Sequence, residues 1–356
     1  MNGRNRPWRI GIIGAGRMGS IRARSARAHP ACEVVHIVDT EPARAAALAR
    51  EMDCAASADW AEVVARPDID AVVVATTHKE LAPITAAALE AGKRVFCEKP
   101  MARNASEARR AVDAAARREP GAGAPLVVGY TLRHHPAVAR ARQLVRGGAI
   151  GRPLYLRARY GHGGRPGYDR EWRADRELSG GGELVDQGVH LIDLSRWLLG
   201  DLDQVSALVE NCFWRGPAGG AGPVEDNAFL LLKGAHGQVA SLHASWTQWR
   251  NLFALEIFGE DGFLIAEGLG GSYGPEQLLW GRRRPEGGAP AVAPVSLAEL
   301  DGSVWDREWS EFVRAAWPAE SGESATSATG LEGWQVLRTV EAAYLSAREG
   351  RTVGLN

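Results

Sequence analysis

The sequence predicts an α/β protein in which a doubly wound parallel sheet is followed by an α+β region with a mainly antiparallel sheet. Short apolar strands alternate with helices over residues 7–129, and a glycine-rich turn joins the first strand to the first helix. From Leu154 onward, strand-like segments follow one another with short turns between them. A chain of 356 residues suggests about two domains, which we expect at 1–129 and 130–356.

The glycine-rich turn follows a buried strand at 9–13. Gly14, Gly16 and Gly19 have the spacing G-x-G-x-x-G, which suits a dinucleotide site. The first glycine allows the tight turn, the second lets the backbone approach a pyrophosphate, and the third lets the helix pack closely on the strand. The start of the following helix offers free N–H groups and the positive end of its dipole to the phosphates.

The second strand, 33–39, ends in an acidic residue at the distance from the glycines that a dinucleotide site requires. The carboxylate of Asp39 can accept both ribose hydroxyls of an adenosine and would repel a 2′-phosphate. The sequence therefore predicts NAD as the cofactor in preference to NADP, although Arg44, one helical turn along, could weaken this preference.

The rest of the first region continues the alternation. Ala71 to Ala75 is a continuous apolar run, typical of a strand that is buried on both faces. Pro42 suits a first-turn position and Gly92 a helix end. Helices are expected at 42–52, 81–91 and 106–118, and strands at 71–75, 94–97 and 126–129.

The second region begins with a helix at 136–146. Its strands are expected at 154–160, 203–214, 226–233, 237–246, 252–258 and 262–267. Two Gly/Pro/Ala-rich segments, 215–222 and 283–294, are expected to be loops. The final helix is predicted at 331–348, and we expect it to pack back near the first domain.

Glu98, Lys99 and Pro100 stand at the C-terminal end of a predicted parallel strand. Ligands of open α/β sheets bind outside those ends, and a lysine there can donate to a substrate oxygen. The alternative is a surface lysine that is paired with Glu98.

A second candidate site follows the glycines at 180–182, which lead into a helix that continues through Leu199. Asp186 and His190 are four residues apart and so share one face of a helix. A carboxylate beside an imidazole orients the ring and raises its basicity, as a proton acceptor requires. The alternative is that Asp186 caps the helix and His190 is a packed polar residue.

The segment 160–173 interleaves glycines with aromatic rings and arginines, which suit sugars and phosphates. It could equally be an ordered loop without a ligand, and Arg133 could line the cleft or lie in a solvated turn. No set of residues suggests a metal site. The substrate-binding candidates of this kind are Arg133, Tyr160, Arg165, Tyr168, Trp172 and Arg173.

Composition excludes several partners. Hydrophobic residues make up 45% of the chain and charged residues 24%, and the formal net charge is −1, so neither nucleic acid nor an anionic membrane is favoured. The four cysteines are scattered, and residues 1–7 lack the apolar core of a signal peptide. No apolar run is long enough to span a membrane. We therefore expect a cytoplasmic protein.

Taken together, these motifs resemble the glucose–fructose oxidoreductase/inositol dehydrogenase/rhizopine-catabolism (Gfo/Idh/MocA) oxidoreductases. The resemblance covers nearly the whole chain: the glycine motif at 14–19, VFCEKP at 95–100, WRAD…SGGGELVDQGVHLIDLSRWLLG at 172–200 and SAREGRTV at 346–353. It implies a Rossmann domain and an α+β domain. It also implies that the large open sheet of the second domain forms the interface of a homodimer or homotetramer.

The resemblance also implies roles for single residues. Lys99 would contact both substrate and cofactor, His190 would be the acid/base, Asp186 would support it, and the peptide before Pro100 would be cis. One departure is that the family often has Asn-x-x-His after the strand at 71–75, where this chain has Thr76-Thr77-His78-Lys79. The expected cofactor-binding residues are Gly14, Gly16, Arg17, Met18, Asp39, Thr40, Arg44, Thr76, Thr77, His78, Glu98 and Lys99.

The resulting hypothesis is an NAD-dependent dehydrogenase that acts on a secondary alcohol of a sugar, an inositol or a nucleotide-linked sugar. Two alternatives are an NAD-using glycosidase of the same fold, which oxidises its substrate only transiently, and a non-catalytic NAD-binding sensor. Stoichiometric consumption of NAD distinguishes the dehydrogenase from the glycosidase, and the intact Lys99, Asp186 and His190 argue against the sensor.

Overall fold

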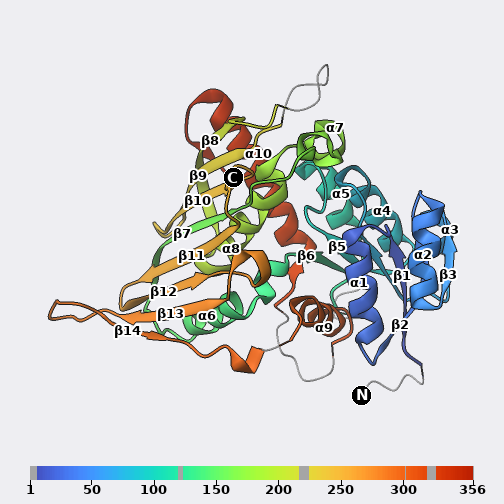
Figure 1. Ribbon diagram of the computed structural model, residues 1–356, viewed down its shortest axis with the longest axis horizontal. Coiled ribbons are helices and arrows are strands. Elements are labelled where there is room, and N and C mark those ends of the chain that lie inside the picture. The colour runs from blue at the N-terminus through green and yellow to red at the C-terminus, as the bar shows by residue number, and fades with distance from the viewer. Residues whose placement is uncertain (1–5, 119–122, 216–223, 301, 319–325, 356) are drawn as a thin grey trace. The chain divides into compact units, whose positions relative to one another are not determined.

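A computed structural model of the chain describes residues 6–118, 123–215, 224–300, 302–318 and 326–355 (Figure 1). The chain divides into two compact units. The first comprises Met1–His134 and Gly302–Gln335, and the second comprises His135–Asp301 and Val336–Asn356. The domain boundary that we expect at residue 129 stays a prediction. The compact unit that contains the N-terminal residues also includes Gly302–Gln335 from near the end of the chain.

The sheet of the first unit has the strand order β15-β6-β5-β4-β1-β2-β3. All of its pairs are parallel except the last one at the edge, where β15 runs antiparallel to β6. The order reverses beside β1, which lies between β2 and β4, so this is the switch point at which open sheets bind ligands. The strands are β1 Trp8–Ile13, β2 Cys32–Val38, β3 Ala55–Ser57, β4 Ala71–Val74, β5 Arg94–Glu98, β6 Leu126–Gly129 and β15 Ala328–Thr329.

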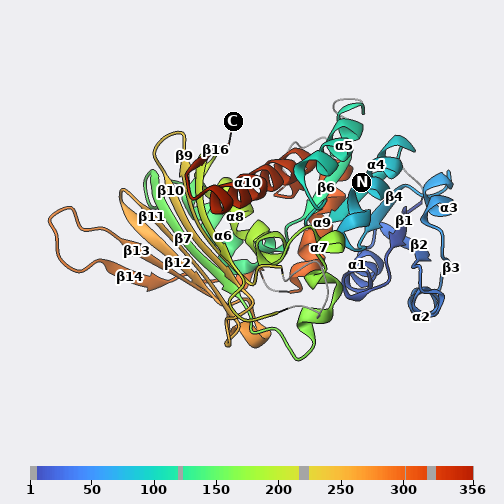
Figure 2. The same ribbon diagram turned by 90° about the horizontal axis from the view of Figure 1, so that it is seen from above.

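Helices cover both faces of this sheet (Figure 2). One face carries α4 and α5, which pack together, and α1 packs with α9 on the other. The predicted doubly wound sheet is thereby confirmed. All four residues of β4 are fully buried, as its continuous apolar sequence predicts. The helices are α1 Arg17–Ala28, α2 Pro42–Met52, α3 Trp60–Ala65, α4 His78–Glu90, α5 Ala105–Ala116 and α9 Val304–Ala316.

One arginine inside the first unit joins helix α1 to three other segments. The Arg22 side chain is fully buried; its Nε lies 2.6 Å from Glu98 Oε1 and its Nη1 lies 2.7 Å from Glu308 Oε2. The hydroxyl of Thr131 donates to the same Glu308 oxygen at 2.7 Å. The guanidinium also lies over the ring of Phe96, 4.4 Å from its centroid. Helix α9 is therefore part of the Rossmann unit through a buried ion pair.

The sheet of the second unit has the strand order β14-β13-β12-β11-β7-β10-β9-β8-β16. Only β7 and β10 pair in parallel, so the predicted mainly antiparallel sheet is confirmed. The strands are β7 Pro153–Gly161, β8 Leu202–Glu210, β9 Asn227–Gly234, β10 Val239–Ser245, β11 Leu252–Gly259, β12 Gly262–Glu267, β13 Gln277–Arg282, β14 Ala291–Pro294 and β16 Val353–Gly354.

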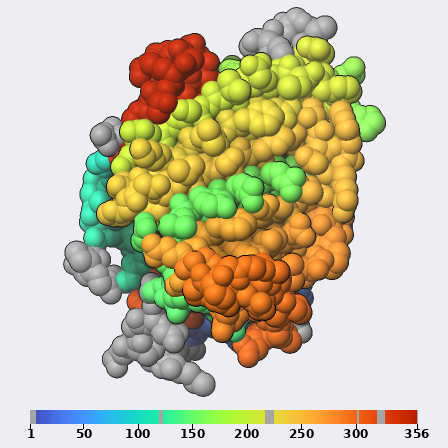
Figure 3. Space-filling view, turned by 90° about the vertical axis from the view of Figure 1, so that its left-hand side faces the viewer, coloured from blue at the N-terminus to red at the C-terminus, as the bar shows by residue number. Residues whose placement is uncertain are grey.

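One face of this sheet packs on helices, and the other is open. α6 (Pro136–Arg146) contacts β12, and α8 (Val189–Leu199) contacts β7 and β10. The unit also contains α7 (Arg176–Ser179) and most of α10 (Gly330–Glu349). Figure 3 shows the opposite face, where the strands lie bare of helices. The large exposed hydrophobic side chains on its strands include Tyr155, Leu208, Phe229, Leu231 and Val239.

Three expectations need correction. The segment 283–294 is not entirely a loop, because Ala291–Pro294 pairs with β13; all four of its residues are exposed, so no hydrophobic alternation marks the strand. The strand predicted at 203–214 ends at Glu210, because the Asp226 carboxylate accepts the amides of residues 212–214. The helix predicted at 81–91 begins earlier, at His78. Of the other predicted loop, residues 216–222 lie outside the described part of the chain.

Candidate functional site

The glycine turn after β1 combines two tightly packed glycines with one that faces open space. Gly14 has a φ of 99°, and a methyl group there would lie 2.4 Å from the carbonyl oxygen of Ala75. A methyl group on Gly19 would lie 1.7 Å from the carbonyl oxygen of Gly14. A methyl group on Gly16 would have no atom within 4 Å. The turn thus requires its outer glycines for packing and leaves room above the middle one.

Helix α1 starts at this opening with unused hydrogen-bonding capacity. Its N-cap, Gly16, makes no side-chain capping bond, and its first turn holds no acidic residue. The first N–H groups of a helix lack partners within it, so they are free to donate hydrogen bonds to a phosphate. The exposed Arg17 and half-buried Met18 belong to the same turn. These features fit the pyrophosphate of a dinucleotide.

Asp39 follows β2 and is 7% exposed. One carboxylate oxygen accepts the backbone N–H of Ala15 at 2.8 Å, and the other accepts that of Glu41 at 2.9 Å. The guanidinium of Arg44 lies 3.5 Å from the first oxygen. A carboxylate oxygen can accept more than one hydrogen bond, so Asp39 fixes the glycine turn and keeps acceptor capacity for a ribose. Thr40, the next residue, is exposed.

The end of β4 lies against the same turn, because the Ala75 carbonyl is the nearest neighbour of Gly14. Thr76 and Thr77 follow and are half-buried, and His78 is the buried first residue of α4. The structure therefore brings the predicted cofactor residues that follow β1, β2 and β4 to one edge of the sheet. What each of them contacts stays a prediction.

The Glu98–Pro100 segment lies at the end of β5. Burial raises the pKa of Glu98, while the guanidinium of Arg22 and the ammonium of Lys99 act in the opposite direction. Lys99 is half-buried, and the Lys99–Pro100 peptide is cis, as the resemblance implies. Glu98 is buried and bonds to Arg22 at 2.6 Å, and the charge of Lys99 acts on the same carboxylate, so the role of Lys99 stays a prediction.

In the second unit, a buried glutamate organises the glycines before the Asp186–His190 helix. Oε1 of Glu225 accepts the N–H groups of Gly182 at 2.8 Å and Leu184 at 3.3 Å, and the hydroxyl of Tyr344 at 2.5 Å. A methyl group on Gly182 would lie 2.0 Å from the Glu225 carbonyl oxygen. Burial raises the pKa of the Glu225 carboxyl group, and the hydrogen bonds from Tyr344 and Gly182 oppose this rise.

Asp186 and His190 follow the segment that is hydrogen-bonded to Glu225, and each of the two is 7% exposed. Asp186 lies within a π-helical turn, Leu184–Gly188, and its N–H donates to the Gly182 carbonyl, so it does not cap the helix. Its Oδ2 lies 3.4 Å from Nε of Arg173, whose guanidinium in turn stacks on Trp172 at 4.5 Å. The loop at 160–173 therefore contacts the Asp186 carboxylate through Arg173, one of the predicted substrate-binding residues.

Tyr160 stands next to His190. Their ring centroids are 6.0 Å apart in an edge-to-face arrangement. Burial raises the pKa of the Tyr160 hydroxyl well above its usual value, and the nearby Tyr273, Asp186 and Glu183 raise it further, so the hydroxyl keeps its proton. Tyr273, which the sequence did not single out, lies 5.6 Å from the Tyr160 ring.

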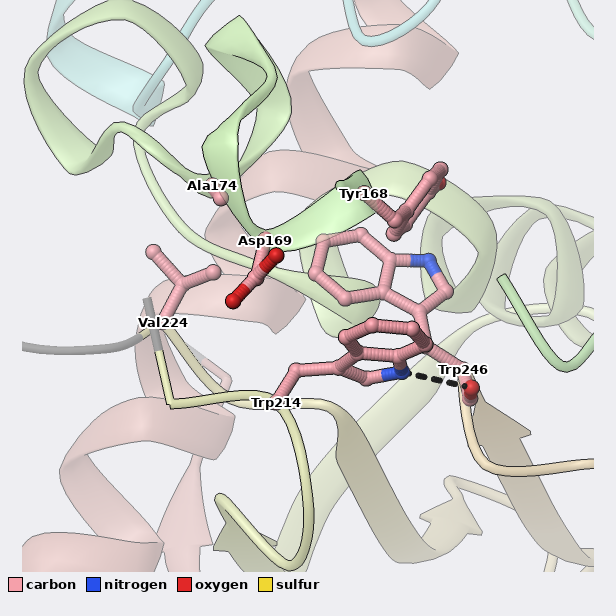
Figure 4. Close-up of a pocket in the computed structure, with 6 residues that line it drawn as sticks. All are labelled: Tyr168, Asp169, Ala174, Trp214, Val224 and Trp246. Carbon is pink, nitrogen blue, oxygen red and sulfur yellow. Dashed lines mark hydrogen bonds between the residues drawn. The ribbon is translucent and has the colours of Figure 1, made fainter. Parts of the chain in front are cut away.

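Tyr168 is packed inside the second unit, where it lines a small, mostly apolar pocket (Figure 4). Its ring lies edge-on to Trp246 at 5.1 Å, and Arg165 covers it at 5.4 Å while pairing with Glu171. Trp214 Nε1 donates to the Trp246 carbonyl at 3.0 Å. These contacts hold the loop, and substrate contact by Tyr168 or Arg165 stays a prediction. The pocket is lined by Tyr168, Asp169, Ala174, Trp214, Val224 and Trp246.

Arg133 belongs to the first unit and has a side chain that is only 2% exposed. It donates to Glu332 at 2.9 Å and to the Thr326 carbonyl at 3.4 Å. Burial would raise the pKa of Glu332, but the Arg133 guanidinium and the Thr329 hydrogen bonds hold it below its usual value. The contacts of Arg133 thus tie 131–134 to the start of α10, and its role in substrate binding remains a prediction.

Two features are absent from the described residues. No group of three or more His, Cys, Asp or Glu residues among them could hold a metal ion. Within the same ranges, no helix has the length and apolar character needed to cross a membrane.

Comparison with known proteins identifies the family. Residues 8–122 match the oxidoreductase family with an NAD-binding Rossmann fold, and residues 138–265 match the GFO/IDH/MocA C-terminal domain. The chain is 31% identical to levoglucosan dehydrogenase of Pseudarthrobacter phenanthrenivorans, covering 72% of each protein. It is 30% identical to inositol 2-dehydrogenase 2 of Saccharopolyspora erythraea, over 96% of this chain and 94% of that protein.

A solved structure of levoglucosan dehydrogenase in complex with NADH and L-sorbose superposes on this chain with a TM-score of 0.86. The match covers 99% of both chains at 26% sequence identity. The two family models match the two units in chain order, and the solved structure has the same architecture over nearly the whole chain. The chain therefore belongs to the GFO/IDH/MocA family of oxidoreductases and carries its NAD-binding Rossmann fold.

Proposed function

We propose that this protein transfers hydride between NAD and a secondary alcohol or ketone of a sugar, an inositol or a nucleotide-linked sugar. The observation that carries the proposal is that Asp186 and His190 are both buried on a helical segment whose start is hydrogen-bonded to Glu225. The same chain also has a glycine turn with open space above Gly16. Relatives named as dehydrogenases of levoglucosan, inositol and D-apiose support the substrate class.

The dinucleotide turn would hold the cofactor through groups that are already in place. The space above Gly16 and the first N–H groups of α1 suit the pyrophosphate, and Asp39 suits the adenosine ribose. Bound at this edge, NAD would supply the hydride acceptor. The other residues that we propose to bind NAD lie at the end of a strand of the same sheet or in the segment that follows it: Arg17, Met18, Thr40, Arg44, Thr76, Thr77, His78, Glu98 and Lys99.

His190 acts as the proton acceptor in this proposal. Oxidation removes a hydride from the carbinol carbon and a proton from its hydroxyl, so a base must lie beside the oxygen. A neutral imidazole is suited to this near neutral pH. Asp186, one turn earlier, stabilises the imidazolium that forms, and reduction uses the same groups in reverse.

Lys99 donates a hydrogen bond to the reacting oxygen, which favours the alkoxide-like charge as the proton leaves. Arg173 limits how far Asp186 can influence His190, because its guanidinium lies 3.4 Å from the same carboxylate. Tyr160 is proposed to contact the substrate, and its ring centroid 6.0 Å from that of His190 supports this. The other residues proposed for substrate binding are Arg133, Arg165, Tyr168, Trp172 and Arg173.

We also propose that the protein is a homodimer or homotetramer that uses the open face of the second sheet. Leu208 is 64% exposed and Leu231 57% exposed on neighbouring strands, and Phe229 lies opposite Leu208 in the strand pairing. A contiguous apolar surface of this kind on a folded domain marks an interface. A second copy covers it best, since most oligomers of soluble proteins are symmetric.

The cofactor site is tested by a methyl group added at each of two glycines. Gly16→Ala places its methyl in open space, so the protein should fold normally while NADH binding weakens by at least about tenfold, because the methyl occupies the pyrophosphate position. Gly19→Ala places its methyl against the Gly14 carbonyl and should disrupt the turn itself. NADH fluorescence and thermal melting measure the two effects. An unchanged NADH affinity in Gly16→Ala would show that the cofactor does not use this turn.

The catalytic assignment is tested by steady-state kinetics with a sugar and polyol panel. His190→Ala should lower kcat by about 10²–10⁴-fold, the usual contribution of a general base, and leave NADH binding intact. Lys99→Ala should also lower kcat, and the double variant should be less than additive because both groups serve one oxygen. Asp186→Ala should be milder. His236, an exposed histidine of the second unit, provides the control as His236→Ala. Near-normal turnover in His190→Ala would refute the mechanism.

The interface is tested by placing a charge on the open sheet face. Wild-type protein should scatter light as a multiple of the 38.2 kDa chain, and Leu231→Glu should reduce that mass, because a carboxylate at a buried apolar contact is costly. Leu331→Glu is the control, since Leu331 is similarly exposed at 51% but lies on α10. A wild-type mass near that of a single chain, or a Leu231→Glu variant of unchanged mass, would contradict the proposed interface.

A further inference from the structure

We propose that Tyr273, on the glycine-rich loop between β12 and β13, belongs to the substrate site. We infer that it binds, together with Tyr160, a hydroxyl oxygen of the sugar or polyol other than the one that reacts. This inference rests on the proposed function of His190. None of the sequence motifs includes Tyr273. Its assignment to the substrate site rests on its contacts in the structure.

The loop holds Tyr273 in a fixed place. Gly268, Gly270, Gly271 and Gly274 all have positive φ, a conformation that other residues rarely adopt. The N–H of Tyr273 donates to the Gly270 carbonyl at 3.1 Å, and that of Gly270 donates to the Gly274 carbonyl at 2.8 Å. A methyl group on Gly268 would lie 2.2 Å from the Pro275 carbonyl oxygen. The chain therefore forms a compact, internally bonded turn whose one aromatic side chain is Tyr273.

That side chain joins the immediate surroundings of His190. The ring centroids of Tyr273 and Tyr160 are 5.6 Å apart. Tyr160 is the residue that lies edge-on to His190 at 6.0 Å. Tyr273 thus lies against the tyrosine that stands beside His190.

The buried Oε1 of Gln187, the residue after Asp186, has no hydrogen-bond partner among the described residues. The surroundings of His190 therefore hold an acceptor as well as the two tyrosine hydroxyls.

The tyrosine hydroxyls suit an uncharged substrate oxygen. Burial raises the pKa of both tyrosines above the usual value, so the pair stays protonated and neutral at physiological pH. Tyr273 is half-buried and so remains accessible. A neutral hydroxyl donor matches the hydroxyl of a sugar or polyol. The reacting hydroxyl needs a base, which His190 provides, so the tyrosine pair is suited to a neighbouring hydroxyl of the same molecule.

The test is Tyr273→Phe, which removes one oxygen and keeps the ring. KM for the best sugar or polyol should rise about three- to tenfold, the loss expected for one neutral hydrogen bond, while kcat changes less than twofold and NADH affinity stays unchanged. Tyr155→Phe is the matched control, because it makes the same change on a residue that is stacked on Phe258 and is not among the substrate candidates. Light scattering should give this control the wild-type mass, since Tyr155 lies on the proposed interface. A KM for Tyr273→Phe that matches wild type for all substrates would overturn the inference, as would a loss of NADH binding or of thermal stability.

Deoxy analogues of the best substrate identify the hydroxyl that is held. One analogue, which lacks that hydroxyl, should have the same KM with wild type and with Tyr273→Phe, while the others keep the full difference. An equal effect of Tyr273→Phe on every analogue would overturn the inference even if KM rises. Failure of the proposed function is a different outcome, because wild type would then produce no NADH with any sugar or polyol.

Discussion

The buried pairing of Arg22 with Glu98 and Glu308 is the interaction on which the first unit depends. It connects helix α1 after the glycine turn, strand β5, which ends at Glu98 just before Lys99, and helix α9 from the last fifth of the chain. A guanidinium that is fully buried is stable only while its carboxylates stay in place, and removal of one partner from such a pair typically costs about 3–5 kcal/mol. The helix that follows the glycine turn and the strand that precedes Lys99 are thus joined through a single cation.

Glu225 has the corresponding place in the second unit. Its carboxylate holds the amides of Gly182 and Leu184 and the hydroxyl of Tyr344, and the helix with Asp186 and His190 starts from there. In both units, a buried ionisable side chain joins its own segment to others, Arg22 through two carboxylates and Glu225 through two backbone amides. The residues proposed to react therefore lie on or beside rigid elements, which suits proton transfer over hydrogen-bond distances.

The sequence predicted those parts of the site whose physical cause is local. The glycine spacing reflects contacts within a single strand–turn–helix, and the Pro42–Met52 helix has its start signal in its own first residue. Helix α9 and Tyr273 gave no such signal, because Glu308 and Tyr273 acquire their partners from segments far away in the chain. Composition alone suggested Arg133 as a substrate residue, yet a remote glutamate pairs with it in the structure.

The most direct test of the proposed mechanism measures whether hydride moves from the substrate to the cofactor. An inositol that carries deuterium on every ring carbon should be oxidised to a ketone with an equal amount of reduced cofactor, and mass spectrometry should find one deuterium in that cofactor. This result requires direct transfer from the carbinol carbon to the nicotinamide, as the proposed roles of His190 and Lys99 demand. The same labelled test applies to the best sugar substrate if inositol is inactive. Product that forms without accumulation of reduced cofactor, or reduced cofactor without deuterium, would contradict the account.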